Sequence, residues 1–119
     1  MIEGIQLAKA CANAAEENKA ENIRVFDLRG QSSITDFIVI CSGTSAPHLK
    51  AILRDMDKDL MQNHKTEPFR TEGMTDARWV ILDYVDVMVH VMLEDMRELY
   101  DLESLWADAA EVAWEESGD

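Results

Sequence analysis

Asp83 and Asp86 are the residues whose type and spacing most suggest chemistry, because they bracket the short segment Tyr84–Val85 between two apolar runs. Two carboxylates at one turn can hold Mg²⁺ together with substrate phosphates. That chemistry also needs cations for the phosphate, and the neighbouring sequence supplies few. Aspartate is also an ordinary turn residue, and an acidic tip can receive Arg or Lys from a protein partner. We favour the two interpretations without a metal.

Ser42-Gly43-Thr44-Ser45 is a second candidate, since it follows an apolar run and precedes a helical pattern. Backbone N–H groups at such a junction can bind a phosphate. The segment lacks the glycine spacing and the lysine of known phosphate-binding loops. We therefore favour a helix-capping turn, in which Thr44 or Ser45 is the N-cap and Pro47 lies in the first turn.

The histidines and cysteines indicate neither a zinc site nor a thiol nucleophile. His48, His64 and His90 have no ligand spacing among themselves, and Cys11 and Cys41 lie 30 positions apart in apolar settings. Burial in apolar surroundings raises a thiol pKa and makes the group inert. Two lone cysteines favour reduced thiols and a cytoplasmic location over a disulfide. We expect no metal and no cofactor.

The residues that must position Asp83 and Asp86 form a predicted hairpin, with strands over 78–83 and 86–92. Val87, Val89 and Val91 alternate with polar or thioether residues and are expected to face the core. The opposite face then carries Asp86, Met88, His90 and Met92, and needs either a covering helix or a partner. Trp79 and Tyr84 are equally suited to a core and to an interface.

The remaining patterns predict a single α/β (α+β) domain with a mixed β-sheet covered by helices. We expect a helix over 4–20, a strand over 23–28 and a doubly buried strand over 37–41. We also expect a short edge strand near Phe69, a helix over 94–100 and a second helix over 104–114. The helix after Ser45 has one apolar face, made of Leu49, Ile52, Leu53, Met56 and Leu60.

Composition limits the classes of partner. The 119 residues carry a net charge of −13, which repels nucleic-acid phosphates and anionic membranes and attracts basic proteins. Seven acids and no Lys or Arg lie in residues 101–119. No apolar run approaches the roughly 20 residues of a membrane span. We therefore expect little or no direct nucleic-acid binding and no membrane association.

Three segments resemble the signatures of the Iojap family, the ribosomal silencing factors. The first runs over 27–45, from Asp27 through Ile34-Thr35-Asp36-Phe37 to Ser45. The second is Trp79–Val91, and the closing segment contains Leu99-Tyr100, Leu102-Glu103 and Leu105-Trp106. The match spans residues 5–106 in order, and we place the family domain at 1–106, followed by an acidic helical extension at 107–119.

The resemblance implies a nucleotidyltransferase-like fold that has lost its chemistry, and thus a protein that is not an enzyme. It implies binding to ribosomal protein L fourteen on the large ribosomal subunit, which blocks joining of the small subunit and represses translation under nutrient limitation. We expect a monomer or weak homodimer. The partner surface is predicted to contain seven residues: Trp79, Asp83, Tyr84, Asp86, Met88, His90 and Tyr100.

Two alternative functions remain open, and one residue departs from the family pattern. A residual metal-dependent nucleotidyltransferase or phosphohydrolase would place Ser42–Ser45 opposite Asp83 and Asp86. A general acidic scaffold would show no selectivity for large subunits. Val85 stands where the family usually has glycine; since a positive φ is costly for valine, we expect a different turn type there.

Overall fold

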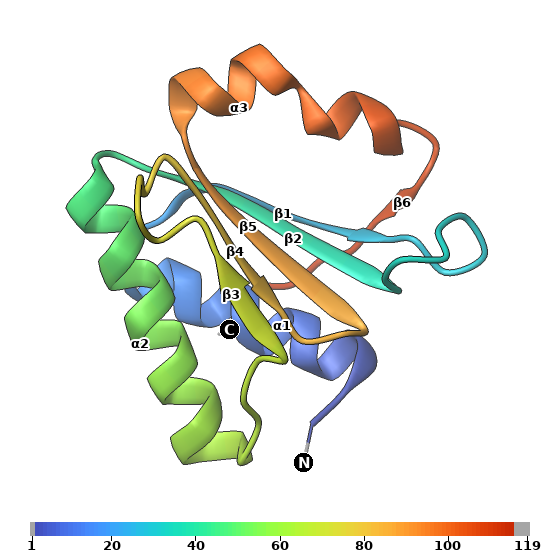
Figure 1. Cartoon of the computed structure of the whole chain (residues 1–119). Helices are drawn as coiled ribbons and strands as arrows, with labels where there is room; N and C mark the ends of the chain where they lie inside the picture. The colour runs from blue at the N-terminus through green and yellow to red at the C-terminus, as the bar shows by residue number, and fades with distance from the viewer. Residues whose placement is uncertain (1, 116–119) are drawn as a thin grey trace.

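The structure is a computed structural model that describes residues 2–115. These residues form a six-stranded sheet in the order β3-β4-β5-β2-β1-β6, with helices on both faces (Figure 1). The elements are α1 (Gly4–Glu17), β1 (Glu21–Asp27), β2 (Phe37–Gly43), α2 (Ala46–His64), β3 (Arg70–Glu72), β4 (Trp79–Asp83), β5 (Val87–Leu93), α3 (Glu94–Tyr100), the 3-10 helix η1 (Leu102–Trp106) and β6 (Ala110–Glu111). The predicted mixed α/β domain is thereby confirmed.

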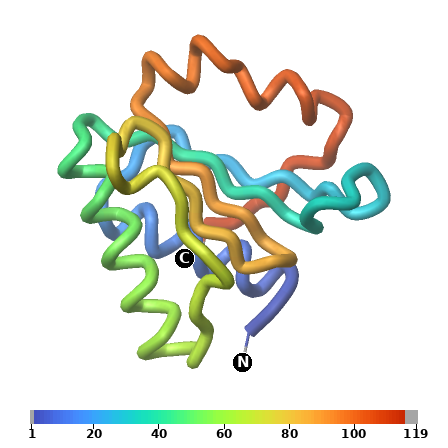
Figure 2. Tube along the Cα trace, viewed as in Figure 1, coloured from blue at the N-terminus to red at the C-terminus, as the bar shows by residue number. Residues whose placement is uncertain are grey.

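Strand β2 is the centre of the sheet, and every one of its residues is buried. It pairs in parallel with β5 and antiparallel with β1, so the sheet is mixed. Its continuous apolar sequence is typical of a strand covered on both faces. The two covering layers are visible along the chain trace, with α1 and α2 on one face and α3 with η1 on the other (Figure 2).

Helices α1 and α2 cover the face that receives Val87, Val89 and Val91, as the alternation predicts. All five apolar residues predicted for α2 are buried, and the Ser45 side chain accepts a hydrogen bond from the backbone N–H of His48. Ser45 is therefore the N-cap, and the capping interpretation of the Ser42–Ser45 segment is confirmed for this residue.

Helix α3 and η1 cover part of the other face, over Phe26, Ile40 and Met92. A buried cation fixes this layer. Arg97, only 5% exposed, donates to the Ser42 hydroxyl at 2.8 Å and to Glu103 at 2.9 Å. Arg24 reaches the same Glu103 carboxylate from β1 at 2.6 Å. Because a buried charge is costly unless it is paired, these bonds hold α3 and η1 in one position on the sheet.

The helix predicted over 104–114 is wrong. Residues 102–106 form a 3-10 helix, and Ala110–Glu111 form β6, which pairs with β1. The sheet edge explains the outcome, because Val112 donates its N–H to the Val25 carbonyl and Trp114 donates its indole N–H to the Ile23 carbonyl. The predicted helical extension is thus not formed over 107–115, and its last four residues lie outside the described part of the chain.

Two further local predictions also change. Phe69 precedes β3 and is 72% exposed, although β3 is an edge strand as expected. Val85 has φ of 78°, so the expectation of a different turn type is wrong. The Asp86 N–H bonds to the Tyr84 carbonyl at 3.1 Å across Val85, which closes a γ-turn of the strained, positive-φ kind.

Candidate functional site

The carboxylates of Asp83 and Asp86 both accept hydrogen bonds from backbone N–H groups. An Asp86 carboxylate oxygen accepts the N–H of Gly4 at 2.6 Å and so caps the first turn of α1 across the fold. An Asp83 oxygen accepts the N–H of Val85 at 2.8 Å, and Arg70 approaches the other oxygen at 3.7 Å. Both carboxylates therefore stabilise the tip through the turn and the helix N-terminus that they contact.

The constellation expected of a phosphoryl-transfer enzyme does not assemble. In the parallel register Phe37 lies opposite Val87 and Gly43 lies opposite Leu93. Ser42–Ser45 and Asp86 are thus at opposite ends of seven-residue strands, about 20 Å apart at 3.3 Å per residue. Within residues 2–115 no three His, Cys, Asp or Glu side chains form a cluster able to hold a metal ion.

Trp79, His90 and Tyr100 meet at the boundary between the sheet and α3. The Trp79 indole N–H donates to His90 Nδ1 at 2.9 Å, and the Trp79 ring centroid lies 5.2 Å from that of Tyr100. His90 is only 8% exposed, and burial lowers its pKa to about 4. The imidazole is therefore neutral at pH 7 and is a fixed acceptor rather than a charged contact.

Asp83 and Met88 continue this face toward the tip. They are direct cross-strand partners of β4 and β5, and both are half-buried. Ile81, opposite His90, is half-buried as well. The rings of Trp79 and of Trp106 in η1 lie beside His90, while Asp83 and Met88 nearer the tip are only half-buried. The structure thus brings five predicted site residues to one face of the sheet: Trp79, Asp83, Met88, His90 and Tyr100.

Tyr84 lies on the opposite face, within the core under α1 and α2, and is 6% exposed. Its hydroxyl is buried and has no hydrogen-bond partner among the described residues. Desolvation raises its pKa far above the usual range. Tyr84 therefore holds the tip against the helices, and its side chain offers almost no area to a partner.

Exposed apolar residues also lie on α3 and η1. Leu99 is 74% exposed, Leu105 73% and Tyr100 53%. The sequence does not distinguish Leu99 and Leu105 from Met96, Leu102 and Trp106, which share their segment and pack inward. No local pattern marks their exposure, because it depends on how much of the sheet face the seven-residue α3 and the 3-10 helix η1 can cover.

The same segment is acidic at its surface. Residues 94–108 contain six carboxylates, and their one cation, Arg97, is buried in its ion pair with Glu103. Five of the six acids are exposed: Glu94, Asp95, Glu98, Asp101 and Asp108. We call the whole region the α3-side surface; its members are Trp79, Ile81, Asp83, Met88, Leu99, Tyr100 and Leu105, with the five exposed acids.

The cysteines take no part in this surface. Cys11 and Cys41 are both free and fully buried. Burial raises the pKa of Cys41 to about 12 and that of Cys11 still further. Thiols with such pKa values are protonated at neutral pH, which agrees with the prediction that they are inert.

Comparisons with known proteins agree on the family. The model of the family described as "Ribosomal silencing factor during starvation" matches residues 2–119. A ribosomal silencing factor of Halalkalibacterium halodurans is 40% identical over 110 residues, covering 92% of this chain and 93% of its own. That of Bacillus subtilis is 39% identical over 103 residues, covering 87% and 86%.

A mouse relative and two solved structures extend the comparison. A mouse protein named for mitochondrial assembly of the ribosomal large subunit is 34% identical over 94 residues, covering 76% of this chain and 40% of its own. A Chromobacterium violaceum crystal structure superposes with a TM-score of 0.84 at 29% identity, covering 89% and 88% of the two chains. A Bacillus halodurans structure gives 0.78 at 36% identity, covering 92% and 99%.

The sequence signatures, the mixed sheet with its two helical layers and these matches all lead to one assignment. No helix in residues 2–115 has the length and apolar character needed to cross a membrane. The chain belongs to the ribosomal silencing factor family, to which the Iojap proteins are also related.

Proposed function

We propose that this protein represses translation by binding ribosomal protein L fourteen on the large ribosomal subunit and blocking the small subunit sterically. The observation that carries the proposal is the α3-side surface, which presents exposed apolar side chains among carboxylates. Large apolar residues at a surface mark interaction sites when they gather in one place. Leu99, Tyr100 and Leu105 are all exposed within one seven-residue stretch of α3 and η1.

The charge of the surface selects the partner. Exposed carboxylates around apolar residues favour a basic protein that offers Arg or Lys beside an apolar patch. A ribosomal protein embedded in RNA has this chemistry. The acidic surface would at the same time be repelled by the surrounding phosphates, which restricts docking to the protein.

The surface is also preorganised. Arg97 fixes α3 to Ser42 and Glu103, and the Trp79–His90 hydrogen bond fixes the indole that contacts Tyr100. Side chains that are already ordered lose little entropy on binding, so more of the contact energy appears as affinity. Trp and Tyr are the residue types that most often dominate interface energetics.

No catalytic group is required for this mechanism. A bound factor of about 31–34 Å in each dimension occupies space that the joining subunit needs. By mass action, half of the large subunits are blocked when the free factor equals its dissociation constant. The name of the mouse relative, which refers to the ribosomal large subunit, supports this choice of partner.

The experiment compares exposed leucines inside and outside the surface. Leu99→Lys combined with Leu105→Lys removes apolar contacts and introduces positive charge, while Ile34→Lys changes an equally exposed residue in the β1–β2 loop. In sedimentation with purified large subunits we expect at least tenfold weaker binding for the leucine variant and wild-type binding for the Ile34 control. Binding of the leucine variant equal to that of the control would overturn the proposal.

A second readout tests the consequence of binding. Wild-type protein added before small subunits should reduce subunit joining, measured by light scattering, in proportion to the occupied fraction of large subunits. The leucine variant should restore joining at equal concentration. Joining that proceeds unchanged at saturating wild-type protein would refute the steric mechanism, even if binding to the large subunit is observed.

A further inference from the structure

The outward face of α2 carries a row of cations at helical spacing. Lys50, Arg54 and Lys58 follow one another at four-residue intervals, and all three are exposed. With a rise of 1.5 Å per residue, the row extends about 12 Å along the helix. The buried residues of α2 lie on its other side, against the sheet, so the row faces away from the core.

The charges of this row are available to a partner. All six arginines of the chain have a carboxylate within 4.0 Å, including Arg54 with Asp55 at 3.4 Å. The Arg54 pair is solvent-exposed, and such pairs contribute about 0–1 kcal/mol and exchange readily. Within residues 2–115, Lys50 and Lys58 form no ion pair.

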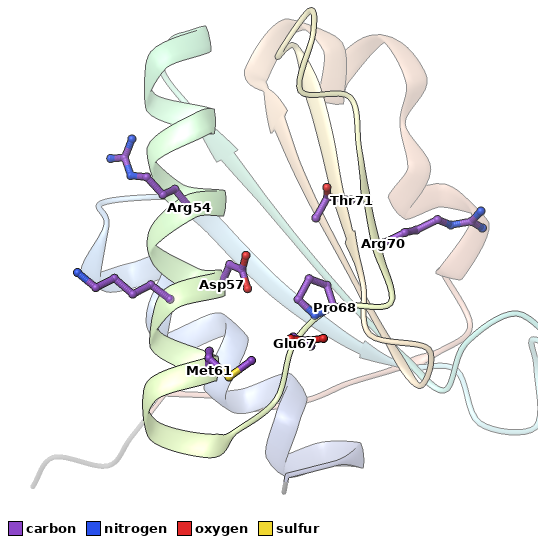
Figure 3. A pocket seen from close by; sticks show the side chains of 8 residues that line it. Arg54, Asp57, Met61, Glu67, Pro68, Arg70 and Thr71 are labelled. Carbon is purple, nitrogen blue, oxygen red and sulfur yellow. The ribbon is translucent and has the colours of Figure 1, made fainter.

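Two aspartates of α2, Asp55 and Asp57, lie beside the row. A groove of about 560 Å³ separates α2 from β3, and Asp57 faces it together with Thr71 across the gap (Figure 3). Arg54 and Lys58 line the same groove from α2 (Figure 3). Asp57 therefore lies beside the row and Asp55 pairs with Arg54, while Lys50 and Lys58 have no carboxylate within 4.0 Å among the described residues.

We propose that the row Lys50–Arg54–Lys58 binds the phosphate backbone of ribosomal RNA next to the protein docking site. The inference rests on the proposed function, which brings the molecule to a particle made of RNA and protein. Lysine acts as a point charge toward phosphates, and a row along a helix can follow a backbone without reading sequence.

The charge distribution fits this assignment. The chain as a whole carries −13 and repels RNA, so attraction has to be local. Helix α2 covers one face of the sheet and the α3-side surface lies on the other. The α3-side surface would thus bind basic protein and the outward face of α2 would bind phosphate. Two such contacts would orient the molecule at a site where protein and RNA are adjacent.

The test reverses the two unpaired lysines of the row and compares them with two unpaired lysines elsewhere. Lys50→Glu with Lys58→Glu changes the net charge by the same amount as Lys9→Glu with Lys19→Glu, whose lysines lie on α1 and in the turn after it. Lys and Glu have similar helix propensities, so both double variants should fold, which circular dichroism checks.

Three probes distinguish the outcomes: purified large subunits, deproteinised large-subunit RNA and isolated ribosomal protein L fourteen. The row variant should bind subunits on the order of tenfold more weakly than the control variant, and bind RNA more weakly at low salt. For binding to subunits, the plot of log K against log salt concentration should have a slope shallower by about 1.4–1.8 for the row variant than for the control, because two phosphate contacts are lost. Binding to the isolated protein should be equal for both variants.

Equal binding of the two variants to large subunits would overturn the inference while leaving the proposed function intact. Weaker binding of the row variant to isolated ribosomal protein L fourteen, or unchanged binding of that variant to RNA, would also overturn the inference, since the row would then contact protein. Failure of the wild type itself to bind subunits would instead refute the proposed function, and the inference with it.

Discussion

Acidification should destabilise this protein through His90. Burial lowers the pKa of the folded imidazole to about 4, against about 6.5 in an unfolded chain. Between these values the unfolded state binds the extra proton, so stability is complete above pH 6.5 and falls as the pH decreases toward 4. A difference of this size corresponds to about 3 kcal/mol, a large part of the stability of a small domain.

The structural cause is the bond that His90 accepts. Protonation of Nδ1 would place a second donor against the Trp79 indole N–H, 2.9 Å away, in a site that excludes water. The ring centroids of Trp79 and Trp106 lie 5.9 Å and 6.5 Å from that of the imidazole, and neither side chain has a carboxylate to stabilise a positive charge. The cost of acidification is therefore the loss of this bond together with desolvation of the imidazolium.

The matched variant is His90→Asn, because its side-chain oxygen can accept from Trp79 near the position of Nδ1 and does not titrate. Urea unfolding at pH 7 and pH 4 gives the loss of stability for each protein. Carboxylates with lowered pKa values, such as Glu103 and Asp27, lose stabilisation in both proteins and cancel in the comparison.

We expect the wild type to lose about 3 kcal/mol more than His90→Asn between pH 7 and pH 4. Any packing defect in the variant is the same at both pH values and also cancels. Equal losses in the two proteins would refute the burial argument for His90, because they would show that its pKa is the same in the folded and unfolded states.

Two further changes concern the hairpin tip. Val85→Gly should raise the free energy of unfolding by about 1 kcal/mol, because glycine adopts a φ of 78° without strain and the valine side chain is exposed. Urea denaturation measures the change, and a destabilised variant would contradict the strain at Val85. Tyr84→Phe should stabilise the protein by about 1 kcal/mol, because it removes a buried hydroxyl without a partner. Thermal unfolding measures it, and a lower melting temperature would indicate that the hydroxyl is bonded in solution.

The regular elements follow from local sequence. The apolar run Phe37–Cys41 predicts a doubly buried strand, and the 3.6-residue spacing of apolar residues in 49–60 predicts the buried face of α2. The alternation of Val87, Val89 and Val91 gives the orientation of β5. In each case the pattern arises because one element faces the core, so the sequence of that element is enough to predict its type and its buried face.

The functional surface depends on contacts that no local pattern contains. The sequence selects Trp79, Asp83, Met88 and Tyr100, but their shared face arises from strand pairing and from the position of α3. Leu99 and Leu105 look like core residues until the area that α3 and η1 can cover is known. Tyr84 resembles an interface aromatic, and only the packing of α1 and α2 buries it.

Sequence by itself therefore determined the α/β class, the two central strands and the acidic character of the molecule. Tertiary structure decided that residues 110–111 form an edge strand, that Val85 has a positive φ, and that Ser42–Ser45 lies far from Asp86. The first and the third are set by partners distant in the chain, namely the edge of β1 and the parallel register of β2 and β5, which outweigh local preference. The turn at Val85 is closed at the hairpin tip by the hydrogen bond from the Asp86 N–H to the Tyr84 carbonyl, a geometry that the valine side chain does not favour.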